Sequence, residues 1–125
     1  MDYSQPVVEA HKKAILQELE QFDQLSFAQI SQLPLCAGED ALTADDDINL
    51  VLWVHLAFET VVALKQLLIE DILDVKTTTP LVYHMDGRTL DFPLAKKIEL
   101  GHYKEPHWVP VIFSKGPKWN GNNIF

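Results

Sequence analysis

The stretch that decides the predicted fold is residues 81–92, which read Leu81-Val82-Tyr83-His84-Met85-Asp86-Gly87-Arg88-Thr89-Leu90-Asp91-Phe92. Both flanks of Asp86-Gly87 follow a period of two, which is typical of strands. Asp-Gly is favoured in two-residue hairpin turns because such turns need positive φ angles. The stretch therefore predicts a β-hairpin with strands over 81–85 and 88–92. Pro93 lacks a ladder donor, so we expect the second strand to lie at an edge or to end there.

The residues near the start of the chain predict two helices. Pro6 suits a first helical turn, and residues spaced by three or four positions share one face of a helix over 6–22. Ser26 is a suitable N-cap for a short second helix over 27–33, which Pro34 ends. The residues expected on the core-facing side of the first helix are His11, Ile15, Leu19 and Phe22.

The middle of the chain predicts a loop and then a long helix. Residues 34–47 mix glycine with acidic residues and show no sustained period, which indicates a loop. The largely apolar run 48–70 predicts a third helix with a break near its middle. The aspartates at 45–47 precede this run, where carboxylates cap a helix and favourably meet its dipole. The first half of the run is apolar all round, so we expect it in the core or at a subunit contact.

The last third of the chain adds one more expected strand. The run 108–114 predicts a strand that Pro110 places at an edge, and residues 116–125 predict an irregular tail. A chain of 125 residues normally builds one hydrophobic core. We therefore expect one α+β domain over 1–115, with N-terminal helices and a small antiparallel sheet.

Composition narrows the classes of partner. The net charge of −8 opposes simple binding to a phosphate backbone. The charge is uneven: residues 1–75 hold 3 basic and 14 acidic side chains, whereas residues 76–125 hold 7 basic and 4 acidic ones. An anionic partner is therefore expected to meet the second part of the chain.

Cysteine usage and the apolar run bear on the compartment. The single cysteine, Cys36, forms no internal disulfide, and the first residues lack the features of a secretory signal, so we expect a cytoplasmic protein. The run 48–69 is as long as a membrane span, but His55, Glu59 and Lys65 interrupt it. A buried helix is the better interpretation.

The order of predicted elements resembles a known superfamily. The most similar piece is the run 63–76, ALKQLLIEDILDVK, followed by 80–87, PLVYHMDG. Helix, short helix, long helix and Asp-Gly hairpin resemble the winged helix-turn-helix superfamily of small DNA-binding regulators, over roughly residues 26–92. In that superfamily such a run closes the recognition helix and leads into the first wing strand. The resemblance implies a dimeric regulator that binds double-stranded DNA.

Candidate nucleic-acid contacts follow from that resemblance, since one arginine would sit at the tip of the wing and lysines flank its strands. Such cations bind phosphates by releasing counterions. The alternative is an ordinary solvated surface whose lysines blunt the sheet edges. The candidates are Lys76, Arg88, Lys96 and Lys97.

Aromatic residues give a second set of candidates, at a protein interface. Trp53 and His55 lie in the apolar run and would pair two copies in a homodimer. Tyr103 and Trp108 flank prolines in a segment whose rigid aromatics are typical of partner surfaces. The alternative is that these aromatics pack in the protein's own core.

No catalytic or metal-binding motif is present in the sequence, and we expect no cofactor. The spacing of His102 and His107 matches no standard ligand set, even with His84, and Cys36 is expected to be a small buried residue. Two hypotheses remain. The first is a winged-helix-like transcriptional regulator or DNA-associated protein, and the second is a non-enzymatic protein–protein interaction domain.

Overall fold

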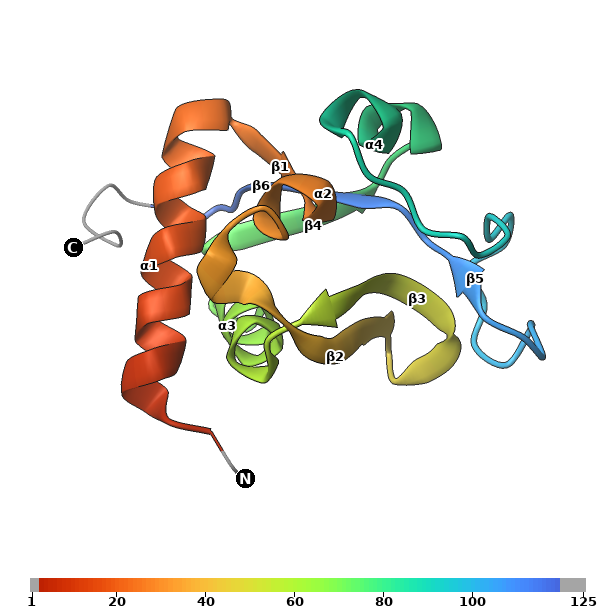
Figure 1. Ribbon diagram of the computed structural model, residues 1–125, viewed down its shortest axis with the longest axis horizontal. Coiled ribbons are helices and arrows are strands. Elements are labelled where there is room, and N and C mark those ends of the chain that lie inside the picture. The colour runs from red at the N-terminus through yellow and green to blue at the C-terminus, as the bar shows by residue number, and fades with distance from the viewer. Residues whose placement is uncertain (1–2, 120–125) are drawn as a thin grey trace.

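Four α-helices and two three-stranded sheets make up residues 3–119, which the computed structural model describes (Figure 1). The α+β class expected from the sequence is confirmed. In chain order the elements are α1 (Gln5–Phe22), β1 (Gln24–Ser26), α2 (Phe27–Ile30), a 3-10 turn (Pro34–Cys36), β2 (Ala37–Ala44), β3 (Asp47–Leu56), α3 (Phe58–Ile69), β4 (Leu73–Thr77), α4 (Pro80–Asp86), β5 (His107–Trp108) and β6 (Val111–Lys115).

The two predicted N-terminal helices are confirmed. His11, Ile15 and Leu19 of α1 are buried as expected, whereas Phe22 is 53% exposed at the end of the helix. Ser26 caps α2 through a capping box: its Oγ accepts a hydrogen bond from the N–H of Gln29, and the Gln29 side chain accepts one from the N–H of Ser26. The helix ends at Ile30, three residues earlier than predicted, and a 3-10 turn begins at Pro34.

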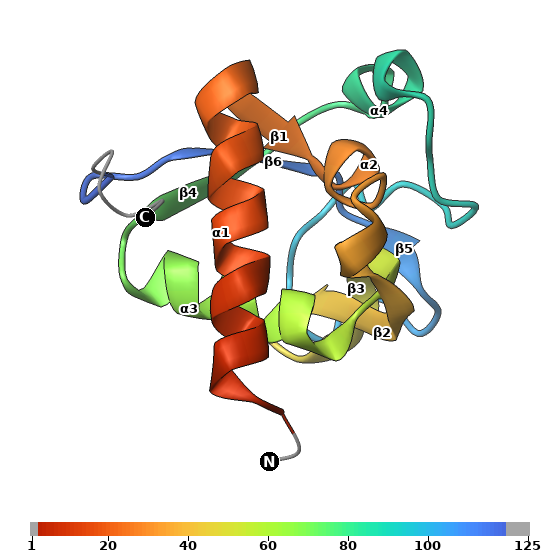
Figure 2. The same ribbon diagram turned by 60° about the vertical axis from the view of Figure 1, so that its left-hand side comes forward.

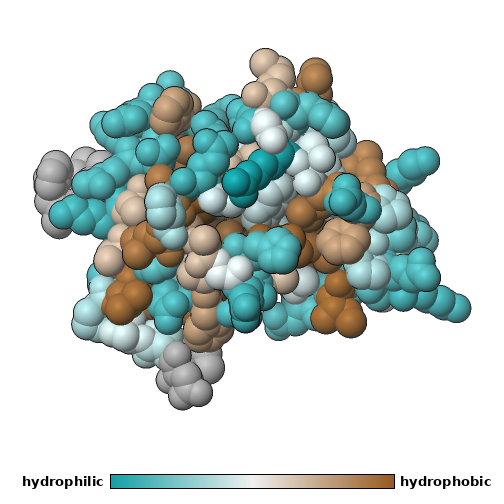
Figure 3. All heavy atoms as spheres, in the orientation of Figure 1, coloured by the Kyte–Doolittle hydropathy of each residue, from teal (hydrophilic) through white to brown (hydrophobic). Residues whose placement is uncertain are grey.

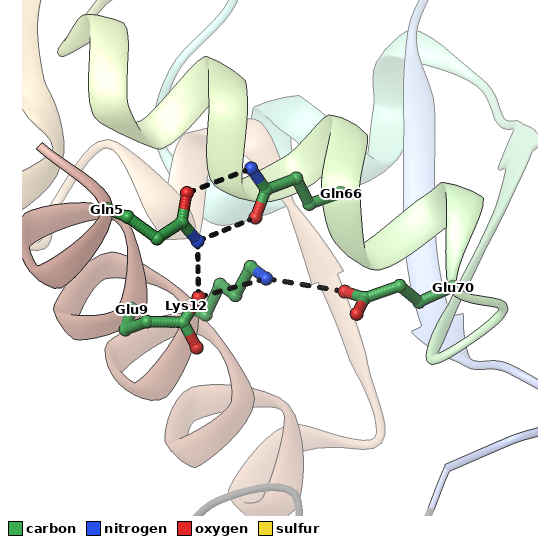
Figure 4. Close-up of polar contacts among 5 residues, drawn as sticks. All are labelled: Gln5, Glu9, Lys12, Gln66 and Glu70. Atoms are coloured by element: carbon green, nitrogen blue, oxygen red, sulfur yellow. Dashed lines mark hydrogen bonds and ion pairs between the residues drawn. The ribbon is translucent and has the colours of Figure 1, made fainter. Parts of the chain in front are cut away.

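Helix α1 crosses α3 and one of the sheets (Figure 2). Polar side chains join the two helices at the surface (Figure 4). Gln5 donates a hydrogen bond to Gln66 at 3.1 Å, and the Lys12 ammonium lies 3.2 Å from Glu9 and 3.3 Å from Glu70. The Lys12 side chain is only 12% exposed, so its ion pairs are partly shielded from water.

The loop and the long third helix predicted for residues 34–70 are wrong over residues 37–56, which form β2 and β3. An apolar run of this length does not distinguish a buried strand from a helix, and pairing with two neighbouring strands decides the outcome here. Asp45 and Asp46 form the turn between the strands, with φ of 49° and 63°, and cap no helix. Hydrogen bonds from the N–H groups of Gly101 and Asn49 hold the pKa of the Asp47 carboxyl below its usual range.

The predicted hairpin over 81–92 is also wrong. Residues 80–86 form α4, and residues 88–92 lie in no strand. Pro80 begins the helix, and Gly87 ends it in the left-handed conformation with φ of 92°. Proline in the first turn and glycine just past the end are the usual boundary residues of a helix. The positive φ that Asp-Gly signalled is therefore used to end a helix rather than to turn a hairpin.

The last part of the chain contributes one strand to each sheet, β5 to one and β6 to the other. One sheet has the order β1-β6-β4 and is antiparallel; the other has the order β2-β3-β5, in which β3 and β5 are parallel. The strand predicted over 108–114 is present but divided at Pro110 into β5 and β6. Strand β6 is the central strand of its sheet, not an edge, because Pro110 falls between the two strands.

The core joins the sheets through an aromatic cluster, each member of which comes from a different element. Ring centroids lie 5.0–6.3 Å apart, in stacked, tilted and edge-on pairs. The cluster consists of Phe27 (α2), Trp53 (β3), Tyr83 (α4), Trp108 (β5) and Phe113 (β6). Of the predicted tail, 116–119 follow β6, and 120–125 lie outside the described residues. No helix within 3–119 has the length and hydropathy needed to cross a membrane.

Candidate functional site

A pocket of about 490 Å³ opens where α2, the end of β3 and the segment after α4 meet. Its volume falls within the roughly 300–1,000 Å³ of typical ligand sites. The pocket combines one guanidinium and one imidazole with hydroxyl groups and apolar side chains. It is lined by Ser31, Ala37, Gly38, Trp53, Val54, His55, Gly87, Arg88, Thr89 and Leu90.

Strands β2 and β3 form one wall of this pocket. Trp53 is 4% exposed and belongs to the aromatic core, whereas His55 is exposed. His55 has a φ of 58°, in the left-handed region that residues other than glycine seldom adopt. The β2–β3 register also shifts repeatedly near this end. Backbone strain of this kind is often retained at functional sites, which marks His55 as a candidate contact.

The segment after α4 forms the opposite wall. The N–H of Arg88 donates to the carbonyl of Tyr83 at 3.1 Å, which fixes the start of this segment to the helix. The guanidinium of Arg88 makes one long contact, 3.4 Å from Nη1 to the Ser31 hydroxyl. No carboxylate pairs with Arg88 among residues 3–119. The guanidinium therefore remains available to an anionic group that enters the pocket.

Contacts between α2 and α4 hold the segment that contains Arg88 close to Ser31. The Ser26 hydroxyl donates to the Asp86 carboxylate at 2.6 Å, and the Gln32 amide donates to the Asp86 carbonyl at 3.3 Å. The Tyr83 hydroxyl accepts a hydrogen bond from the N–H of Phe27 at 3.1 Å. The position of Arg88 relative to Ser31 is thus set by three hydrogen bonds, of which the one between Phe27 and Tyr83 is buried.

Two of the four predicted nucleic-acid cations, Arg88 and Lys76, border different cavities. Arg88 lines the pocket beside Trp53, whereas Lys76 lines a second groove that includes Leu52. The Lys97 ammonium is 2.9 Å from Glu99.

Two of the residues predicted to form a protein interface, Tyr103 and Trp108, make contacts within the chain itself. Trp108 is 3% exposed in the core, and its Nε1 is buried without a hydrogen-bond partner in the described part of the chain. The Tyr103 hydroxyl accepts hydrogen bonds from the N–H groups of Lys96 and Lys97, at 2.9 and 3.0 Å, and its ring stacks on His107 at 3.7 Å. Tyr103 therefore organises the segment that carries the two lysines.

The remaining histidines and the cysteine do not build a second centre. Cys36 is buried, and burial raises the pKa of its thiol more than a hydrogen bond with Thr60 lowers it. His102 lies edge-on to Tyr103, and His84 is exposed on α4. Within residues 3–119, no three His, Cys, Asp or Glu side chains are grouped so as to hold a metal ion.

Sequence reasoning named Trp53, His55 and Arg88, but assigned them to two different surfaces. The structure brings all three to one pocket. It adds Ser31, which lies in the predicted second helix, and Gly38, which lies in the segment 34–47 that was interpreted as a loop. Comparisons with models of protein families, with curated protein sequences and with solved structures found no match to this chain.

Proposed function

We propose that this chain is a non-enzymatic protein-interaction domain whose pocket receives an apolar side chain flanked by a carboxylate. The observation that carries the proposal is the guanidinium of Arg88, which has no carboxylate partner among residues 3–119 and borders the same pocket as Trp53 and Leu90. Arginine pairs with carboxylates through two parallel hydrogen bonds, and the apolar wall favours a large side chain beside them.

Exposed apolar residues on α4, the helix that precedes Gly87 and Arg88, support a protein partner. Leu81 and Met85 are 65% and 80% exposed, and their spacing of four places them on one face of α4. Apolar side chains project over α4 at the surface (Figure 3). Helix α4 leads directly into Gly87 and Arg88 at the pocket, so a partner seated there can also contact this face.

The DNA-binding hypothesis stays a prediction. The net charge of −8 opposes it, and the candidate cations Arg88 and Lys76 lie at different cavities.

The pocket can be tested with a matched pair of probes, N-acetyl-phenylalanine and its amide, added to ¹⁵N-labelled protein. We expect the carboxylate probe to shift the amide signals of Gly38 and Arg88 and the indole signal of Trp53. Arg88→Gln should weaken carboxylate binding roughly tenfold or more and leave the amide probe unchanged, because only the charged hydrogen bonds are lost. Lys13→Gln is the control, since it removes the same charge from an exposed position on α1.

Two further arms separate the hypotheses. A peptide with an aromatic residue beside an aspartate should bind more tightly than N-acetyl-phenylalanine, whereas tighter binding of the small acid would indicate a metabolite site. Equal binding of acid and amide would contradict the role of Arg88. Salt-sensitive binding to mixed-sequence duplex DNA, lost in Lys76→Glu, would favour the regulator instead.

A further inference from the structure

Strand β4 forms one edge of the sheet β1-β6-β4. It pairs with β6 in a regular antiparallel register, from Leu73 opposite Lys115 to Thr77 opposite Val111, without a bulge. Residues 74–77 are all exposed. The edge strand β2 of the other sheet is different, since repeated register shifts interrupt its ladder. Bulges protect an edge from further pairing, so β4 is the more suitable edge for an added strand.

The hydrogen bonds at both ends of β4 fix which backbone groups face outward. The N–H of Gly116 donates to the carbonyl of Ile72 at 2.8 Å, and the N–H of Thr78 donates to the carbonyl of Pro110 at 2.9 Å. In an antiparallel ladder every second residue bonds to the neighbouring strand, so the even-numbered residues 72–78 bond towards β6. The backbone groups of Leu73, Val75 and Thr77 therefore face away from it. Within residues 3–119, no backbone hydrogen bond joins these groups to another segment.

We propose that two copies of this chain pair through β4, antiparallel and centred on Val75. A hydrogen-bonded ladder has to join outward-facing residues of one copy to outward-facing residues of the other. In the proposed register Val75 lies opposite Val75, and Leu73 lies opposite Thr77 in both directions. The pairing joins the β1-β6-β4 sheet of one copy to that of the other, which gives one six-stranded sheet across a two-fold axis.

The charges on β4 select this register. Asp74 lies opposite Lys76 of the second copy, and Lys76 lies opposite Asp74, so one interface contains two complementary pairs. These are non-hydrogen-bonded positions, at which Cα atoms are about 4.5 Å apart and side chains are closest. Neither residue has an ion-pair partner of its own among residues 3–119. A shift by two residues would oppose Asp74 to Asp74, or Lys76 to Lys76, and is therefore disfavoured.

An apolar groove beside β4 gives the pairing apolar surface to bury. The groove has a volume of about 210 Å³, and its lining includes Val75, Ile98, Val109 and Val111. Val75 is 39% exposed and Ile98 is 55% exposed. The second copy would bring its own Val75 next to this groove and remove part of that surface from water.

The test is sedimentation velocity of the chain between about 1 and 200 μM, a concentration range that brackets a weak dimer. The variants Asp74→Lys and Lys76→Asp are measured beside the parent. Each variant alone turns both pairs into like charges, and we expect the dimer dissociation constant to rise roughly tenfold or more. Both positions are exposed, so the variants should keep the circular dichroism spectrum and unfolding midpoint of the parent within a few degrees.

Two combinations make the test specific to this register. A mixture of the two single variants should form a heterodimer, because both charged positions of β4 are then basic in one copy and acidic in the other. The double variant Asp74→Lys with Lys76→Asp should restore homodimers to within about threefold of the parent. A parent chain that is monomeric at the highest concentration would overturn the proposal, and so would a dimer whose dissociation constant neither single variant changes.

Discussion

The hydroxyl of Tyr83 donates a hydrogen bond to the carbonyl of Val111 at 2.6 Å, which links α4 to the central strand β6. The same hydroxyl accepts the bond from Phe27 N–H, and Tyr83 is fully buried. Tyr83→Phe would leave two buried backbone groups without a partner, so we expect the free energy of unfolding to fall by about 1–3 kcal/mol in urea denaturation. Tyr3→Phe, at a partly exposed ring, should change it by much less. Equal effects of the two variants would contradict the role of this hydroxyl.

Tyr83 also predicts how stability depends on alkaline pH. Burial raises the pKa of its phenol to about 12, from an ordinary value of about 10. The unfolded chain releases this proton first, so the stabilisation is complete below about pH 10 and is lost as pH rises to about 12. Unfolding measured between pH 9 and about 11.5 should show a steeper loss in the parent than in Tyr83→Phe. Parallel profiles would contradict the prediction.

A second buried pair gives a prediction at acidic pH. His11 Nδ1 lies 2.8 Å from the Thr60 hydroxyl, and both residues are buried. Burial lowers the pKa of His11, and the charge of Glu59 acts in the opposite sense with a smaller effect. The unfolded chain therefore binds a proton more readily than the folded chain near pH 6. The stabilisation is present above the ordinary histidine pKa of about 6.5 and is lost as pH falls through the lowered value.

Thermal unfolding at pH 7.5 and pH 5.0 tests this linkage. We expect the unfolding midpoint of the parent to fall more on acidification than that of His11→Gln, whose side chain does not titrate. His84→Gln is the control, because it makes the same substitution at an exposed position on α4. If His11→Gln kept the full acid sensitivity of the parent, other groups would have to account for it.

Local signals predicted the elements whose boundaries are set locally. Ser26 was expected to cap the short second helix, and in the structure it does so, with the Gln29 side chain completing a capping box. Helix α1 was predicted because the spacing of its apolar residues is also a local signal. The strand 108–114 was found from its composition, although its central position depends on pairing with β1 and β4.

The errors fall where distant contacts decide between two local solutions. The run 47–56 is apolar enough for a helix, but pairing with β2 and β5 makes it a strand. Residues 80–87 fit both a hairpin and a helix, and packing of Tyr83 against Phe27 and Val111 favours the helix. The pocket depends on both outcomes, since they bring Arg88 to Trp53. Its residues could therefore be named from the sequence, but their proximity could not be predicted.

The last prediction concerns Gly38, where β2 lies against Ala57, the residue before α3. A Cβ atom at Gly38 would lie 2.5 Å from the Cα and 2.6 Å from the N of Ala57, and these are backbone atoms that cannot move aside cheaply. Ala57 is held in place because its N–H donates to the carbonyl of Cys36 at 2.9 Å. We expect Gly38→Ala to lower the free energy of unfolding by about 1–3 kcal/mol, through overpacking.

Asparagine at two glycine positions separates crowding from backbone strain. Gly87 has a φ of 92° with open space around it, and asparagine tolerates left-handed angles, so Gly87→Asn should be mild. Gly38→Asn should be at least as harmful as Gly38→Ala, because the larger side chain meets the same backbone atoms. Urea denaturation of the parent and the three variants gives the order of their free energies of unfolding. If Gly38→Asn were as stable as Gly87→Asn, β2 would not lie against Ala57, and the wall of the pocket that contains Gly38 and His55 would have to be placed differently.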